Sequence, residues 1–95
     1  MRTRYLVCYD ICHPKRLRNV AKACESFGSR IQFSVFECPL DELRFEKMKA
    51  TLSDIIHHDE DQILFVSLGP ETSKNPFRIE ALGTPYRMRS RITII

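Results

Sequence analysis

The segment from residue 4 to residue 28 limits the fold most narrowly, because it joins a buried strand directly to an amphipathic helix. Its first seven residues, RYLVCYD, form a short apolar run typical of a buried strand that ends at Asp10. Pro14 suits the first turn of a helix, where its missing N–H group is not needed. Gly28 is expected to follow the last turn in a left-handed conformation. A chain that begins in this way predicts a mixed α and β domain.

The helix that begins at Pro14 is predicted to have an apolar face and a basic face. The apolar residues recur at the spacing of a stripe that packs on a core. They are Leu17, Val20, Ala21, Cys24 and Phe27. Lys15, Arg18 and Lys22 recur at the same kind of spacing on the opposite face. This row of cations either follows a phosphate backbone or is simply the solvated face of the helix.

The rest of the chain adds strands and a second helix, without a repeat or an interdomain linker. Residues 30–38 alternate in polarity and are interpreted as one strand, bent or broken near Ser34. A second helix is expected from about Asp41 to Ile56. Further strands are expected over residues 62–68, 77–82 and 92–95. The order β-α-β-α-β-β-β predicts one α+β domain over residues 1–95, with two helices on one face of an antiparallel sheet.

The last predicted strand, ITII at residues 92–95, has no polar face. An exposed apolar strand is an aggregation hazard, so this one is expected to pair with a sheet edge. That edge belongs either to the same chain or to a second copy, whose addition would build a dimer through main-chain hydrogen bonds.

Composition and cysteine use indicate an ordinary globular protein in a reducing compartment. The chain has 95 residues, of which 43% are hydrophobic and 28% are charged. No run approaches the roughly 18 apolar residues of a membrane span, and no signal-peptide core follows the N-terminus. We therefore expect a cytoplasmic protein with no membrane association, whose four cysteines are reduced thiols rather than disulfides. The spacing of Cys8, Cys12 and His13 lacks a usual zinc pattern, and no second ligand pair follows.

Charge is unevenly distributed around the net value of +3. Residues 13–30 and 74–95 are basic, and residues 37–61 are acidic. A bipolar molecule of this kind can offer one face to a polyanion.

Asp10, at the end of the first strand, is the candidate catalytic residue, although such a residue is as often a helix cap or a turn residue. Lys15 and Arg16 lie in the first helical turn, where the helix dipole disfavours cations unless an anion binds there. A single carboxylate holds Mg²⁺ only weakly, whereas two Asp10 side chains of a two-fold dimer would supply a pair. Such a metal would favour phosphodiester hydrolysis.

Several motifs resemble a known family. They are Y-D-I at residues 9–11, K-R-L-R-N-V-A-K at 15–22, G-x-R-I-Q-F-S-V-F-E-C at 28–38, and a late L-G. Together they resemble the CRISPR-associated endoribonuclease family Cas2, the small subunit that partners the spacer-acquisition integrase. The resemblance implies a ferredoxin-like fold, a homodimer and a divalent metal near its two-fold axis, bound by Asp10.

The residues expected to bind nucleic acid come from two sources. The basic helix contributes Lys15, Arg16, Arg18 and Lys22. The resemblance adds Tyr9, Arg30, Ser34 and Phe36.

Three functions remain open from the sequence. The first is Mg²⁺-dependent cleavage of single-stranded RNA or double-stranded DNA centred on Asp10, in a dimeric subunit of the spacer-acquisition complex. The second is a non-catalytic scaffold that holds DNA for the integrase. The third is a related toxin-type ribonuclease. An RNA-recognition motif is disfavoured, because its aromatic signature is missing.

Overall fold

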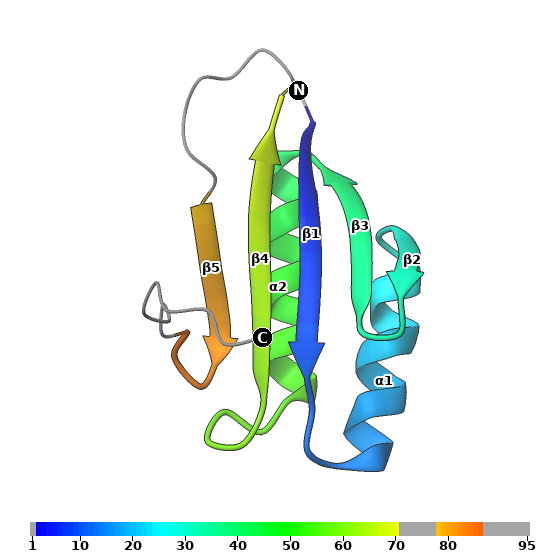
Figure 1. Ribbon diagram of the computed structural model, residues 1–95, viewed down its shortest axis with the longest axis vertical. Helices are drawn as coiled ribbons and strands as arrows, with labels where there is room; N and C mark the ends of the chain where they lie inside the picture. The colour runs from blue at the N-terminus through cyan, green and yellow to red at the C-terminus, as the bar shows by residue number, and fades with distance from the viewer. Residues whose placement is uncertain (1, 71–77, 87–95) are drawn as a thin grey trace, which may run out of the picture.

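The computed structural model describes residues 2–70 and 78–86, in which two helices pack on one face of a five-stranded antiparallel sheet (Figure 1). The elements are β1 (Thr3–Asp10), α1 (Pro14–Glu25), β2 (Ser29–Gln32), β3 (Val35–Leu40), α2 (Glu42–Ile55), β4 (Gln62–Gly69) and β5 (Arg78–Gly83). The strand order across the sheet is β2-β3-β1-β4-β5. The predicted ferredoxin-like α+β class is confirmed.

The core lies between the helices and the inner face of the sheet. β1 is central, because it pairs with β3 on one side and with β4 on the other. Val7 stands opposite Phe36 on β3 and Phe65 on β4, and all three are buried. The helices close this layer with four fully buried side chains, Val20, Cys24, Met48 and Leu52.

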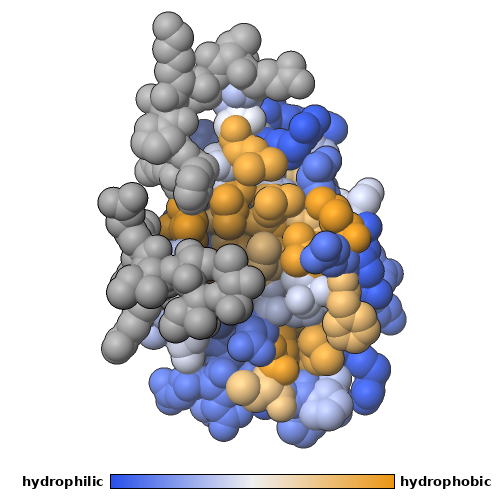
Figure 2. All heavy atoms as spheres, viewed as in Figure 1, coloured by the Kyte–Doolittle hydropathy of each residue, from blue (hydrophilic) through white to orange (hydrophobic). Residues whose placement is uncertain are grey.

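The opposite face of the sheet carries no helix within the described residues (Figure 1). Alternation along the strands directs Leu6 and Cys8 of β1 to this face, together with their β4 partners Val66 and Leu64. Leu68, near the end of β4, is 45% exposed. Figure 2 shows apolar atoms gathered over the middle of this face. We call these five residues the open apolar face.

The stretch 30–38, interpreted as one strand bent or broken near Ser34, is two strands joined by a tight turn. β2 and β3 pair antiparallel, and the chain reverses at Phe33 and Ser34. The expected break near Ser34 is confirmed as this reversal. The single strand was wrong, because the two-residue period of polarity continues through the turn. Side chains of β2 are all exposed, so its alternation does not reflect a buried face.

Both helices form where the sequence places them. α1 begins at Pro14 as predicted, and α2 lies within the predicted range, with Asp41 as its N-cap. The Asp41 carboxylate accepts a 2.7 Å hydrogen bond from the Arg44 N–H group. The expectation for Gly28 was wrong, because α1 ends at the right-handed C-cap Ser26. Gly28 instead allows close packing, since a Cβ there would overlap the carbonyl oxygen of Glu37 on β3.

The last strands follow the prediction as far as the structure describes them. β4 and β5 each lie within one residue of their predicted ends. The predicted strand at residues 92–95 lies outside the described residues. Within the described part of the chain, neither helix has the length and apolar character needed to cross a membrane.

Candidate functional site

Asp10 is exposed at the end of the central strand β1. It pairs in register with Gln62 of β4 and lies on the sheet side that carries the open apolar face. Within residues 2–70 and 78–86, no group donates a hydrogen bond to its carboxylate and no cation pairs with it. In the part of the chain that the structure describes, this carboxylate caps no helix and joins no turn hydrogen bond, so it faces solvent and can take a ligand from it. The helix cap is His13, whose Nδ1 accepts a hydrogen bond from the Lys15 N–H group.

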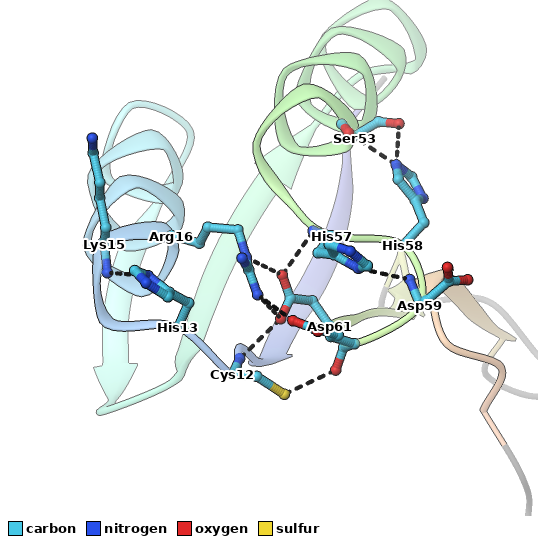
Figure 3. Close-up of polar contacts among 10 residues, drawn as sticks. Cys12, His13, Lys15, Arg16, Ser53, His57, His58, Asp59 and Asp61 are labelled. Atoms are coloured by element: carbon cyan, nitrogen blue, oxygen red, sulfur yellow. Dashed lines mark hydrogen bonds and ion pairs between the residues drawn. The ribbon is translucent and has the colours of Figure 1, made fainter.

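The loop that follows Asp10 is held by Asp61, a fully buried residue just before β4. The Asp61 carboxylate accepts hydrogen bonds from the N–H groups of Cys12 at 2.9 Å and His57 at 2.8 Å. It also accepts from the Arg16 side chain, with Nε at 2.8 Å and Nη2 at 3.4 Å (Figure 3). Asp61 therefore joins the β1–α1 loop, the first turn of α1 and the end of α2. We call this arrangement the Asp61 anchor.

The main chain of Asp61 adds a fourth connection. Its carbonyl oxygen accepts a 2.8 Å hydrogen bond from the Thr84 N–H group, just after β5. Gly83 comes before Thr84 with φ of 87°, and a Cβ there would overlap that same carbonyl oxygen. The exit of β5 is thus fastened to the residue that holds the loop after Asp10.

The electrostatics of the anchor favour an ionised Asp61. Burial would raise the pKa of this carboxyl group, but hydrogen bonds from Arg16 and from the Cys12 and His57 N–H groups lower the pKa to about 2. The pairing with Asp61 in turn raises the pKa of the Arg16 guanidinium. At neutral pH the anchor is therefore a full ion pair with its hydrogen bonds satisfied.

Arg16 was predicted to contact nucleic acid, and in the structure its guanidinium binds carboxylates of the same chain. Besides Asp61 it contacts Glu60, with Nη2 2.9 Å from Oε1, and its side chain is only 23% exposed. For Arg16, the carboxylates of Asp61 and Glu60 take the place of the external anion expected near the first turn of α1. A contact between Arg16 and substrate stays a prediction.

The other cations of α1 face solvent. Lys15, Arg18 and Lys22 are all exposed, on the helix that begins four residues after Asp10. Within the described residues they form no ion pair. Their arrangement is compatible with both the phosphate-binding and the solvated interpretations.

The remaining predicted contacts surround the β2–β3 turn. Tyr9 is 6% exposed and Phe36 is fully buried, with ring centroids 6.2 Å apart. Burial raises the pKa of Tyr9. Arg30 is exposed, and its guanidinium carbon lies 5.2 Å from the centre of the Phe36 ring. Ser34 accepts the Tyr9 N–H group through its carbonyl oxygen at 3.1 Å. Both rings are core residues, and Arg30 is the member of this set that faces solvent.

The donor set suits only a weakly held, hydrated metal ion. Within the described part of the chain, no group of three or more His, Cys, Asp and Glu side chains is arranged to hold a metal. Asp10 supplies one exposed carboxylate. A hard cation such as Mg²⁺ accepts this when waters, substrate phosphate oxygens or a second carboxylate complete its shell. The four cysteines are free thiols.

Sequence reasoning did not identify Asp61. It follows Asp59 and Glu60 in an acidic run before β4, and nothing in that run distinguishes the buried acid from its neighbours. What distinguishes Asp61 is its contact with Arg16 and Cys12, which lie 45 and 49 positions earlier in the chain.

A five-stranded ferredoxin-like sheet with an exposed carboxylate at the end of its central strand places the chain among small ferredoxin-like α+β proteins. The family model described as "CRISPR associated protein Cas2" matches residues 1–75. The chain belongs to the Cas2 family, and the resemblance read from its motifs is confirmed.

Individual relatives agree with this assignment. The chain is 38% identical over 82 residues to a "CRISPR-associated endoribonuclease Cas2" of Geobacter sulfurreducens, covering 86% of this chain and 85% of that protein. It is 44% identical over 69 residues to a "CRISPR-associated endonuclease Cas2" of Halalkalibacterium halodurans, covering 67% and 72%. The crystal structure of Streptococcus pyogenes Cas2 is similar with a TM-score of 0.66 and 44% identity, over 70% of this chain and 86% of that one.

Proposed function

We propose that the chain is a dimeric nucleic-acid-binding subunit in CRISPR adaptation that cleaves phosphodiester bonds at Asp10 with a bound Mg²⁺ ion. The relatives named as endoribonuclease and endonuclease support a nuclease. The observation that carries the proposal is the exposed Asp10 carboxylate, which has no partner in the described part of the chain. The four free cysteines suit action in the cytoplasm.

Asp10 would hold the metal ion. When bound, a divalent cation stabilises the charge that develops on the phosphate and lowers the pKa of a bound water. The Asp61 anchor fixes the loop that begins directly after Asp10, which limits the movement of that carboxylate. Lys15, Arg18 and Lys22 attract the substrate backbone and neutralise its phosphates.

The open apolar face supports a homodimer. An apolar sheet face that no helix covers within the described residues favours burial against a second copy, because removing apolar area from water is stabilising. Asp10 lies on the same side of the sheet, at the end of β1. Packing two such faces together would place both Asp10 carboxylates at one interface, where they complete the ligand set that a single chain leaves short.

A non-catalytic scaffold is the second candidate. Its support is that the end of β1 supplies only one candidate metal-binding carboxylate per chain, Asp10, whereas α1 exposes a row of three cations. In this role the dimer holds duplex DNA for the integrase subunit through phosphate contacts, and Asp10 contributes only to the shape of the interface.

Comparing Asp10→Asn with the wild type tests the enzyme directly. Purified protein is incubated with single-stranded RNA and with double-stranded DNA, in Mg²⁺ and in a chelator. Cleavage is expected to require Mg²⁺ and Asp10, while the dimer measured by light scattering persists. Asp54→Asn is the matched control, because Asp54 is an exposed acid on α2. If Asp10→Asn cleaves like the wild type, the enzyme proposal fails; if it also binds duplex DNA normally, the scaffold is favoured.

Charge reversal tests the binding role that both candidates share. Lys15→Glu with Arg18→Glu is expected to weaken nucleic-acid binding and to flatten its dependence on salt, because about 0.9 counterions are released per duplex phosphate contacted. Binding that is unchanged in both respects would contradict the role given to α1.

A further inference from the structure

The turn between β2 and β3 exposes an aromatic ring. Phe33 is 77% exposed, and Ile31 before it is 53% exposed. Tight turns favour Gly, Asn, Asp, Ser and Pro, whose backbone properties suit the reversal. Phe33 has none of these backbone properties, and its ring buries little area in the core. Neither the turn conformation nor core packing therefore explains why an aromatic residue stands at this position.

The exposed ring lies beside the end of β1. The carbonyl oxygen of Ser34 accepts the N–H group of Tyr9, and the carbonyl oxygen of Phe33 accepts the Tyr9 hydroxyl at 3.3 Å. Figure 1 shows the β2–β3 turn next to the end of the β1 arrow. Asp10 is the next residue after Tyr9. The turn is therefore fixed to the strand end that carries the candidate catalytic carboxylate.

A cation accompanies the ring. The Arg30 guanidinium carbon lies 6.0 Å from the centre of the Phe33 ring and 5.2 Å from that of Phe36. Arg30 is exposed, and within the described residues it forms no ion pair with an acid. Arg30 interacts with the Tyr9 hydroxyl, but its charge has no acid partner among the described residues. An exposed aromatic ring beside such a guanidinium matches a nucleotide, whose base stacks on rings and whose phosphate binds arginine.

We infer that Phe33 stacks on an unpaired base of the nucleic acid bound at Asp10, with Arg30 pairing to an adjacent phosphate. The inference rests on the proposed nucleic-acid binding and makes it more specific. In a duplex each base is already stacked on its neighbours, and exposing one costs a few kcal/mol. A single-stranded segment offers base faces without that cost, so Phe33 and Arg30 favour a single strand at the cleavage position.

Binding of a labelled single-stranded oligonucleotide tests the inference. The measurement is fluorescence anisotropy in a chelator, so that cleavage does not interfere. Phe33→Ala is expected to weaken binding roughly 5- to 30-fold, the loss of one base-stacking contact. Phe33→Trp is expected to retain the wild-type affinity. Leu43→Ala is the matched control, since Leu43 is an exposed apolar residue of α2 at 79% exposure, and no change is expected.

An abasic oligonucleotide separates stacking from charge. With the bases removed and the phosphates kept, wild type and Phe33→Ala are expected to bind equally. If Phe33→Ala binds the normal oligonucleotide like the wild type while Lys15→Glu with Arg18→Glu weakens binding, stacking is overturned and the proposed binding stands. If neither change has an effect, the proposed binding itself fails, and the stacking inference with it. If Phe33→Ala lowers the mass measured by light scattering, Phe33 is a contact between copies, which also overturns the inference.

Discussion

Replacing Asp61 by Asn perturbs the anchor while keeping the size of the side chain. The wild-type carboxylate is fully buried and accepts hydrogen bonds from two main-chain N–H groups and from Arg16. The neutral amide loses the ion pair and turns an NH₂ group toward one set of these donors. The ion pair left to Arg16 is the one with Glu60, whose side chain is 54% exposed.

The structure sets the size of the effect. The shift of the Asp61 pKa from 3.8 to about 2 corresponds to roughly 2 kcal/mol of stabilisation. Removing one partner of a buried pair costs about 3–5 kcal/mol, which sets the upper limit. For a domain of this size, each kcal/mol lowers Tm by about 4–8 °C, so Asp61→Asn is expected to lower Tm by roughly 8–40 °C at pH 7.

The pH dependence has a definite sign. The pKa of Asp61 in the folded chain lies below its ordinary value, so its contribution is complete above about pH 4 and is lost as pH falls toward about 2. The difference in Tm between the wild type and Asp61→Asn should therefore shrink as the pH falls from about 4 to about 2. Thermal unfolding followed by circular dichroism at pH 7, 4, 3 and 2 measures both effects.

Asp59→Asn is the matched control, because Asp59 is an exposed acid two residues away. An exposed substitution of this kind is expected to change the free energy of unfolding by less than about 0.5 kcal/mol. Equal melting temperatures for the two variants at pH 7 would refute the anchor.

Two further predictions concern the surroundings of this loop. His13→Ala removes the N-cap that accepts the Lys15 N–H group at 3.1 Å and is expected to cost about 1 kcal/mol, measured by urea unfolding; an unchanged midpoint would contradict the cap. Burial raises the pKa of Cys24 to about 12 and that of Cys38 to about 11, so iodoacetamide at pH 8 is expected to modify the exposed Cys12 first. Mass spectrometry of the native protein checks the order, and early modification of Cys24 would show that the core opens.

The elements predicted best are those whose periodicity reflects burial. The run before Asp10 and the helices after Pro14 and Asp41 bury one face each, so their apolar spacing located them within a few residues. β2 buries no face, and its polarity pattern is continuous with that of β3, so the reversal at Phe33 and Ser34 left little trace in the pattern.

The sequence predicted a site residue only where its role follows from its place relative to a local element, such as the end of a strand. Asp10 could be found because it ends an apolar strand. The buried positions of Tyr9 and Phe36 follow from which face of the sheet the helices cover, and that is a property of the whole fold. Asp61 and the internal partner of Arg16 depend on a contact between distant loops, which no local pattern specifies.

The Thr84 hydrogen bond gives Asp61 a mechanical role as well as an electrostatic one. The carbonyl oxygen of Asp61 binds the chain that leaves β5, and its carboxylate binds the loop after Asp10. A displacement of Thr84 at the exit of β5 would therefore act, through this one residue, on the loop that follows Asp10.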